Sequence, residues 1–290
     1  MFQEEIAKAR VLTEALPYIR KFRGHKVVVK YGGSLMFDDR LRQVFATDIA
    51  LLKYVGIDPI IVHGGGKEIS EWMKKLGKES VFIDGLRYTD AETMEMTEMV
   101  LSGKINAEVV SVINRGGGKA VGLSGKDADL FTARKIRTKD NKDLGFVGDI
   151  ESTDTTLLQT LSERGYIPVV SSVASSKEGD TLNLNADYVA AGLAGALKAL
   201  KLIYLTDVAG VMKGGELLQL LDLDEAETLL SHPDLKGGML PKLECAIRAI
   251  KDGVRDVHII NGSIEHAVLL EVFTDVGIGT MLREKKIRGY

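Results

Sequence analysis

The chain alternates short apolar, mostly β-branched runs with longer segments in which apolar residues recur every three or four positions. An apolar run without polar alternation is typical of a strand covered on both faces, and the longer spacing is typical of an amphipathic helix. Their alternation predicts a mostly parallel sheet with helices packed against it. The predicted strands and strand-to-turn segments are 26–30, 59–62, 120–125, 167–170, 202–208 and 257–260.

The helical segments begin with residues 3–22, where Pro17 predicts a kink and Gly24 an end. Thr89 and Glu92 match a capping box in front of a long helix over residues 90–115. Residues 130–150 alternate loosely around glycines and predict one or two β-hairpins at the edge of the sheet. Further helices are expected over 38–56, 67–76, 154–164, 187–200, 223–231, from Gly238 to Asp252, and up to Phe273.

Composition and charge narrow the class of protein. The 290 residues suit one large α/β domain or two lobes, with 45% hydrophobic and 27% charged residues. A net charge of −3 argues against nucleic acid or an anionic membrane as the main partner. The single cysteine, Cys245, fits a reducing cytosol. No apolar run approaches the ~20 residues of a membrane span, and charges interrupt the N-terminus, so we expect a cytoplasmic protein.

Glycines and lysines recur where predicted strands end. The first strand runs into Lys30-Tyr-Gly32-Gly33-Ser34, and the second runs into His63 and three glycines. A third device, Lys236-Gly237-Gly238, opens a helix that carries Lys242. Bare backbone amides, a helix N-terminus and a lysine together form an anion site, and the carboxyl ends of parallel strands meet at one edge. These turns therefore predict a phosphate-binding edge.

The missing motifs limit the chemistry. The chain has no G-x-x-x-x-G-K-[ST], no G-x-G-x-x-G after a strand, no H-E-x-x-H and no G-x-S-x-G. His63 is the one histidine placed for chemistry, and a structural hydrogen bond is the expected role for it. Phosphoryl transfer needs mainly positioning and positive charge. A carboxylate acceptor is already ionised at pH 7 and needs no base, so the scarcity of candidate bases favours such an acceptor.

Six motifs in order closely resemble the N-acetyl-L-glutamate kinases of the amino acid kinase family, from about Lys26 to Arg283. This resemblance implies the amino acid kinase fold, a three-layer α/β/α sandwich with a mostly parallel central sheet and, here, an N-terminal helical extension. It implies transfer of phosphate from ATP to the side-chain carboxylate of N-acetyl-L-glutamate, the second step of arginine synthesis. The motifs are Lys30-Tyr-Gly-Gly-Ser, Val62-His-Gly-Gly-Gly, Gly85-Leu-Arg, Asn183-Leu-Asn-Ala-Asp, Leu205-Thr-Asp-Val and Gly237-Gly-Met-Leu-Pro-Lys.

The resemblance also implies a division of labour along the chain. Residues 1–25 would be an oligomerisation arm, 26–175 a lobe that binds the acyl-amino acid, and 176–290 a lobe that binds the nucleotide. Together residues 26–285 would form a single kinase domain. Mg²⁺ would be held largely by the phosphates of ATP, with no metal ligand from the protein.

Site roles follow from the matched motifs. Lys30 and Lys242 would stabilise the transferring phosphoryl group from opposite sides, and Asp187 would orient both lysines. Arg87 would bind the α-carboxylate of the acyl-amino acid. The other residues implied for the acceptor are Gly33, Gly65, Gly66, Asn183 and Asn185, with the Gly33 and Gly65 amides near the phosphoryl group. Those implied for the nucleotide are Gly32, Thr206, Asp207, Val208, Gly238 and Met239.

The N-terminal helix resembles the extension of arginine-inhibited members of the family, in which it interlaces dimers. This implies a homo-oligomer, a hexamer built as a trimer of dimers, with L-arginine as an allosteric inhibitor. The arginine site would involve that helix, Lys201 and the segment from Glu271 to Gly277.

Two departures and two alternatives stay open. Lys67 and Ala209 stand where the family often has other residues, and Lys67 adds a charge near the substrate loop. One alternative is another amino acid kinase, such as a glutamate 5-kinase, although the length leaves no room for the domain that this enzyme often adds. The other is a non-catalytic sensor of nucleotide or arginine, which the presence of both lysines disfavours.

Overall fold

The computed structural model describes residues 2–235, 237–274 and 277–285. An eight-stranded sheet forms its centre, in the order β14-β16-β15-β11-β1-β2-β8-β5, and only the β15–β16 pair is antiparallel. The predicted mostly parallel sheet is therefore confirmed. Its strands are β1 (Lys26–Tyr31), β2 (Asp58–His63), β5 (Ala120–Ser124), β8 (Ile167–Ser171), β11 (Lys201–Thr206), β14 (Leu220–Asp222), β15 (Asp256–Asn261) and β16 (Gly279–Arg283).

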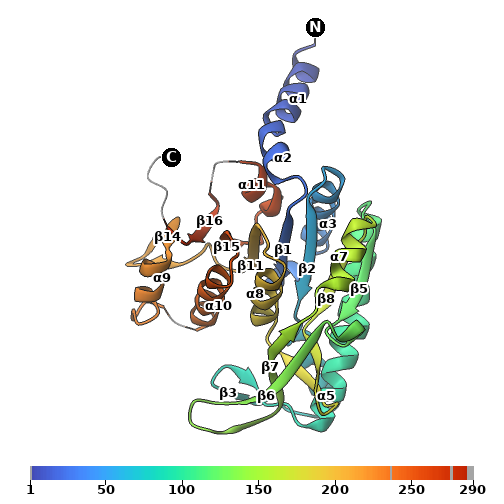
Figure 1. The fold of residues 1–290 in the computed structure, drawn as a ribbon, viewed down its shortest axis with the longest axis vertical. Helices are drawn as coiled ribbons and strands as arrows, with labels where there is room; N and C mark the ends of the chain where they lie inside the picture. The colour runs from blue at the N-terminus through green and yellow to red at the C-terminus, as the bar shows by residue number, and fades with distance from the viewer. Residues whose placement is uncertain (1, 236, 275–276, 286–290) are drawn as a thin grey trace.

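Helices cover both faces of this sheet, which confirms the predicted three-layer sandwich (Figure 1). Successive side chains of a strand point to opposite faces of a sheet. Since Val27, Val28 and Val29 of the first strand are all fully buried, this central strand is covered on both sides. One layer contains α3 (Asp39–Tyr54), α6 (Asn106–Arg115) and α11 (Ala267–Phe273). The other contains α7 (Thr156–Glu163), α8 (Ala186–Ala196), α9 (Leu223–Leu229) and α10 (Met239–Lys251).

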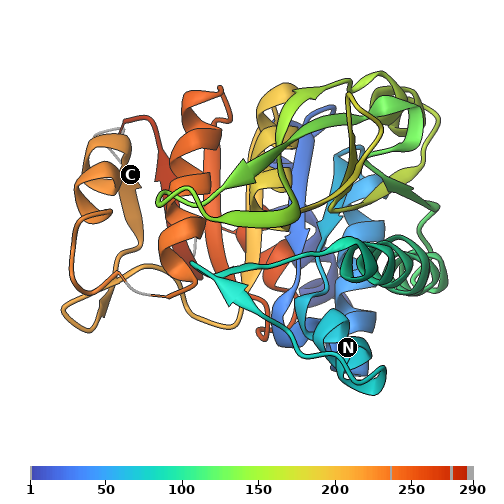
Figure 2. The same cartoon turned by 90° about the horizontal axis from the view of Figure 1, so that it is seen from below.

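Strand register brings the ends of the predicted strands together. Lys30 of β1 lies beside Val62 of β2 and Tyr204 of β11, and all three are next to or close to the carboxyl ends of their strands. Figure 2 shows β1, in blue, between the C-terminal third of the chain on one side and the cyan and green segments on the other. The chain thus folds its first glycine turn into the middle of the functional edge.

The N-terminal extension is two helices, α1 (Gln3–Glu14) and α2 (Leu16–Phe22). The break falls at Ala15, two residues before Pro17, as expected for a residue that cannot donate a backbone hydrogen bond. In Figure 1, α1 projects away from the sheet. Several large apolar side chains of this extension are exposed in the single chain, namely Phe2, Ile6, Val11, Leu12 and Leu16.

The hairpin predicted over residues 130–150 is present and belongs to a small closed ring of four strands beside the main sheet. The expected boundary between two lobes, at residue 175, falls inside the last strand but one of this ring. The ring contains β6 (Phe131–Arg137), β7 (Asp143–Thr153), β9 (Val173–Ser176) and β10 (Thr181–Leu184). The last residues of the expected C-terminal lobe, 286–290, lie outside the described part of the chain.

The long helix expected over 90–115 differs from its prediction in two ways. It contains a π-helical segment, Met99–Ile105, between α5 (Ala91–Glu98) and α6. Its N-cap is Asp90, whose carboxylate accepts a hydrogen bond from the backbone N–H of Thr93 at 2.8 Å. The prediction of a capping box formed by Thr89 and Glu92 was therefore wrong. Thr89 is buried, and its hydroxyl donates to the carbonyl of Arg87 instead.

Short elements complete the fold. They are the hairpin β3 (Phe82–Ile83) and β4 (Leu86–Arg87), the hairpin β12 (Met212–Lys213) and β13 (Glu216–Leu217), helix α4 (Gly66–Lys75), and the 3₁₀ turns at Gly33–Met36 and Asp127–Asp129. Among the described helices, none combines the length and the apolar character needed to cross a membrane.

Candidate active site

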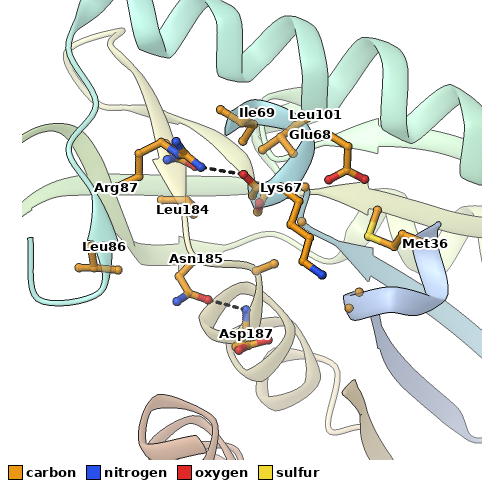
Figure 3. Close-up of a pocket in the computed structure, with 18 of the residues that line it drawn as sticks. Met36, Lys67, Glu68, Ile69, Leu86, Arg87, Leu101, Leu184, Asn185 and Asp187 are labelled. Carbon is orange, nitrogen blue, oxygen red and sulfur yellow. Dashed lines mark hydrogen bonds between the residues drawn. The ribbon is translucent and has the colours of Figure 1, made fainter. Parts of the chain in front are cut away.

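A cavity of about 260 Å³ opens at the carboxyl edge of the sheet. The glycine turns after β1 and β2 form its floor, and the β3–β4 hairpin and the start of α8 contribute its walls. Figure 3 shows side chains from these separate segments converging on one space. The lining includes Lys30, Gly32, Gly33, Gly65, Gly66, Arg87, Asn183, Asn185 and Asp187, nine of the residues that the sequence pointed to.

Asp187 lies between the two candidate catalytic lysines. Its Oδ1 is 3.1 Å from Lys30 Nζ, and its Oδ2 is 3.0 Å from Lys242 Nζ. Lys30 comes from the end of β1, Asp187 from the first turn of α8 and Lys242 from the first turn of α10. Three elements distant in sequence therefore place two ammonium groups on one carboxylate.

The protonation of Asp187 follows from this contact. Burial by itself would raise the pKa of its carboxyl, but the charges and hydrogen bonds of Lys30 and Lys242 outweigh burial and hold that pKa below its usual value. The carboxylate stays ionised at neutral pH and is engaged by two cations. It is therefore placed to orient the lysines rather than to accept a proton.

Arg87 is a buried guanidinium without an acidic partner among the described ion pairs. It donates to the carbonyl of Gly66 at 2.7 Å and to the hydroxyls of Ser70 at 2.8 Å and Ser80 at 2.6 Å. The ring of Phe82 lies 4.8 Å from its guanidinium carbon. A buried cation held by neutral groups at the wall of a cavity is suited to bind a carboxylate.

The three-glycine turn packs tightly against the π-helical segment. Gly65 is buried, and a Cβ at this position would overlap Ile105 and would lie 2.8 Å from Leu101. Leu101 and Ile105 are themselves almost fully buried. Only glycine therefore lets the backbone of this turn reach the cavity without displacing the segment. A π-helical segment at a functional site is a common arrangement.

The side chain of His63 contacts the same turn. It is fully buried, with Nδ1 3.0 Å from the carbonyl of Gly64 and Nε2 3.0 Å from the side-chain amide of Asn106. Since a carbonyl can only accept and the Asn106 nitrogen can only donate, the ring carries its proton on Nδ1. Burial lowers the pKa of His63 to about 4, so it is neutral and structural, as expected.

The two asparagines have different surroundings. Asn183 lies in β10, and its side-chain amide donates to the hydroxyl of Thr89 at 3.3 Å. Asn185 is the N-cap of α8, and its side-chain oxygen accepts from the backbone of Asp187 at 2.8 Å. Both side chains line the cavity, and Asn185 also fixes the start of the helix that carries Asp187.

The residues expected for the nucleotide, apart from Gly32, lie outside this cavity. Thr206 is buried at the end of β11 and exchanges hydrogen bonds with the backbone of Val208. The carboxylate of Asp207 lies against Gly33, where a Cβ would be 2.5 Å from it. Gly238 and Met239 form the start of α10, on the same side as Lys242, whereas Lys236 of the same motif lies outside the described residues.

A separate buried cluster contains Lys201 and Glu271, two of the three residues expected for arginine. Lys201 Nζ is 2.9 Å from His258 Nε2, and His258 Nδ1 is 2.7 Å from a carboxylate oxygen of Glu271. Phe22 of α2 covers Lys201, with the amine 5.5 Å from the ring centroid. Burial lowers the pKa of both Lys201 and His258. Gly277, the third residue expected for arginine, is exposed, and residues 275 and 276 lie outside the described part of the chain.

Other residues of the cavity carried no sequence signal. Met36, Phe37, Glu68, Phe82 and Ser172 line it, although none belongs to a glycine turn or a recognisable motif. In the portions of the chain that the structure describes, no three histidine, cysteine, aspartate or glutamate side chains are grouped to hold a metal ion. The cavity thus offers cations, backbone amides and amide side chains, a set suited to an anionic ligand with several oxygens.

Comparison with known proteins agrees with this chemistry. Residues 25–261 match the amino acid kinase family. The chain is 52% identical to an acetylglutamate kinase of Pelotomaculum thermopropionicum, covering 96% of this chain and 98% of that one. It is 51% identical to one of Syntrophobacter fumaroxidans, with 95% and 96% covered.

Solved structures share the fold. An N-acetylglutamate synthase from Neisseria gonorrhoeae, complexed with coenzyme A and N-acetyl-glutamate, superposes with a TM-score of 0.84 at 29% identity, covering 95% of this chain and 63% of the synthase. A carbamate kinase from Giardia lamblia has a TM-score of 0.65 at 15% identity, which shows a common fold alone. From the sequence match and the near full-length identity, the chain belongs to the amino acid kinase family and, within it, to the acetylglutamate kinases.

Proposed function

We propose that the cavity binds N-acetyl-L-glutamate and that the enzyme transfers the γ-phosphoryl group of ATP to the side-chain carboxylate, giving N-acetyl-L-glutamyl 5-phosphate and ADP. This is the second step of arginine biosynthesis. The observation that carries the proposal is the pairing of two cationic ends in one cavity. Arg87, buried and without an acidic partner among the described ion pairs, is at one end. Lys30 and Asp187 are at the other end, and Lys242 contacts the Asp187 carboxylate from outside the residues that line the cavity.

The acceptor would bind with its two carboxylates at these two ends. Arg87 takes the α-carboxylate, while Asn183, Asn185 and the amides of the glycine turns hold the acyl group and the reacting carboxylate. That carboxylate is ionised at neutral pH and attacks phosphorus directly, so the reaction needs no general base. This fits a site whose buried carboxylate, Asp187, is already engaged by two lysines.

Lys30 and Lys242 would neutralise charge on the phosphoryl oxygens as the bond to ADP breaks and the bond to the carboxylate forms. Asp187 keeps both amines in place before substrate arrives, so little reorganisation is needed during the reaction. The Gly33 and Gly65 amides add hydrogen bonds to the same oxygens. The nucleotide would lie over Gly32, Thr206, Asp207, Val208, Gly238 and Met239.

Magnesium would arrive with the nucleotide. Of the two acidic residues that line the cavity, Asp187 is engaged by lysines, and burial raises the pKa of Glu68. We assign neither of them to magnesium, and the proposal leaves Mg²⁺ with the phosphates of ATP and routes no step through a protein ligand.

The test is ADP release from ATP·Mg²⁺ with N-acetyl-L-glutamate, measured beside L-glutamate, L-aspartate and uridylate. Turnover with the acetylated acid alone is expected. Turnover with L-glutamate instead would indicate a glutamate 5-kinase-like specificity. Nucleotide binding without turnover of any acceptor would favour a non-catalytic sensor.

We also propose that L-arginine inhibits the enzyme by binding at the Lys201–His258–Glu271 cluster. Glu271 offers a carboxylate for a guanidinium, and Phe22 connects the cluster to the N-terminal extension. An N-acetylglutamate synthase with a TM-score of 0.79 to this chain, at 29% identity and 64% coverage of the synthase, has been solved with L-arginine. Loss of inhibition in Glu271→Gln, with turnover retained, would support this location.

The exposed apolar residues of α1 support a homo-oligomer in which this helix packs on a neighbouring subunit, with a hexamer as the expected assembly. A dimer mass in light scattering of the full-length protein would count against the hexamer. Cys245 is buried and unpaired, which supports a reducing, cytoplasmic location.

A further inference from the structure

Lys67 is the one lining cation of the cavity that the proposed mechanism does not use. It follows the three-glycine turn as the second residue of α4, and its side chain is exposed. Figure 3 shows this side chain extending into the cavity, directed away from Arg87. Its amine lies 5.4 Å from the centroid of the Phe37 ring, and Phe37 lines the same cavity just beyond the first glycine turn.

The other cations of the lining already have described partners. Lys30 shares the Asp187 carboxylate with Lys242, and Arg87 is held by neutral oxygens. Burial raises the pKa of Glu68, which disfavours its charged form. Among the described ion pairs none includes Lys67. The mouth of the cavity therefore carries a positive charge that no described carboxylate balances.

The position of Lys67 favours the acceptor over the nucleotide as its ligand. The preceding residue, Gly66, accepts a hydrogen bond from Arg87 through its carbonyl, so Lys67 follows directly on the segment that builds the acceptor end. The residues expected for the nucleotide, Gly32 excepted, lie outside the cavity that Lys67 lines. The Phe37 ring holds the amine on this side and limits the freedom of a flexible side chain.

We infer that Lys67 is a specificity-determining residue that binds the reacting carboxylate of the acceptor and raises its affinity before phosphoryl transfer. This inference rests on the proposed function, because it requires an acceptor with a second carboxylate beyond the one that Arg87 takes. Lys67 acts in binding and is exposed, so its effect falls on the KM for the acceptor and weakens with salt.

The same helix supplies a matched control. Lys75 also lies over an aromatic ring, with its amine 4.7 Å from the centroid of Trp72, but neither Lys75 nor Trp72 lines the cavity. Lys75→Met therefore removes one lysine, one positive charge and one cation–π contact from α4 without touching the site. An effect of net charge alone will appear equally in Lys67→Met and Lys75→Met, and thermal unfolding of both variants separates any change in helix stability, because the two lysines lie at opposite ends of α4.

The experiment measures steady-state kinetics of the full-length wild type, Lys67→Met, Lys67→Arg and Lys75→Met at low and high salt, varying acceptor and ATP separately. We expect Lys67→Met to raise the KM for N-acetyl-L-glutamate about 5- to 20-fold at low salt, with kcat within about twofold. The effect should shrink at high salt, and Lys67→Arg should restore most of the affinity.

Two results would overturn the inference. One is a KM for the acceptor in Lys67→Met within twofold of that in Lys75→Met, and the other is a change confined to the KM for ATP. Failure of the proposed function is separately visible, because the wild type would then show no turnover with N-acetyl-L-glutamate at all.

Discussion

Gly65 and Ile105 approach each other so closely that a Cβ on Gly65 would overlap the end of the Ile105 side chain. The φ of Gly65 is 174°, an extended value that any residue adopts, so backbone strain does not demand glycine here. The requirement is steric, and it couples the cavity floor to the π-helical segment.

Gly65→Ala is therefore expected to displace the turn and to lower kcat/KM about 100-fold, because misplacing a site by about 1 Å has effects of that order. Adding Ile105→Val, which shortens the opposing side chain, should recover part of the loss. Gly66→Ala has open space at its Cβ and serves as the control for stability in thermal unfolding. A Gly65→Ala enzyme with wild-type kinetics would contradict the steric account.

Lys30→Ala and Lys242→Ala should each lower kcat about 100-fold or more while the fold survives. Each amine would interact with charge that develops in the transition state, so the loss falls on kcat rather than on binding. Single-turnover kinetics and circular dichroism of the two variants give the measurement and its control. Retained turnover in both would remove the roles assigned to these lysines.

Arg87→Lys should raise the KM for the acceptor about 10- to 100-fold with a smaller change in kcat. Lysine keeps the charge but cannot reproduce the planar fork that contacts Gly66, Ser70 and Ser80 together. The KM for ATP is the internal control and should stay within about twofold. An unchanged acceptor KM would show that the α-carboxylate binds elsewhere.

His63 should make the protein less stable as the pH falls. Its pKa is lowered from 6.5 to about 4. Between these two pH values the imidazole is mostly protonated in the unfolded chain and mostly neutral in the native state. The free energy of unfolding therefore falls with pH, by about 2 kcal/mol from this group between pH 7 and pH 5.

Denaturant unfolding at the two pH values tests this effect. His63→Gln should lose about that much less stability than the wild type over the same interval. His25→Gln, which removes an exposed imidazole, is the matched control. Equal pH dependence in the wild type and His63→Gln would show that the pKa of His63 is not lowered in the native state.

Local pattern determined most of the elements of this protein. The unbroken apolar runs predicted the central strands, and periodicity predicted the covering helices, because burial on two faces or on one leaves a direct mark on residue order. Lys30 and the two glycine turns could be assigned to one sheet edge, since parallel strands end together. The ordered motifs then identified the family.

Tertiary structure decided the contacts between distant segments. The two ion pairs of Asp187 depend on how β1, α8 and α10 pack, and the tight fit of Gly65 depends on a π-helical segment that periodicity does not reveal. The ring of β6, β7, β9 and β10 and the approach of Lys67 to Phe37 have the same origin. A sequence pattern records whether a residue is buried and with what period, whereas the partner it meets is set by register and packing over the whole chain.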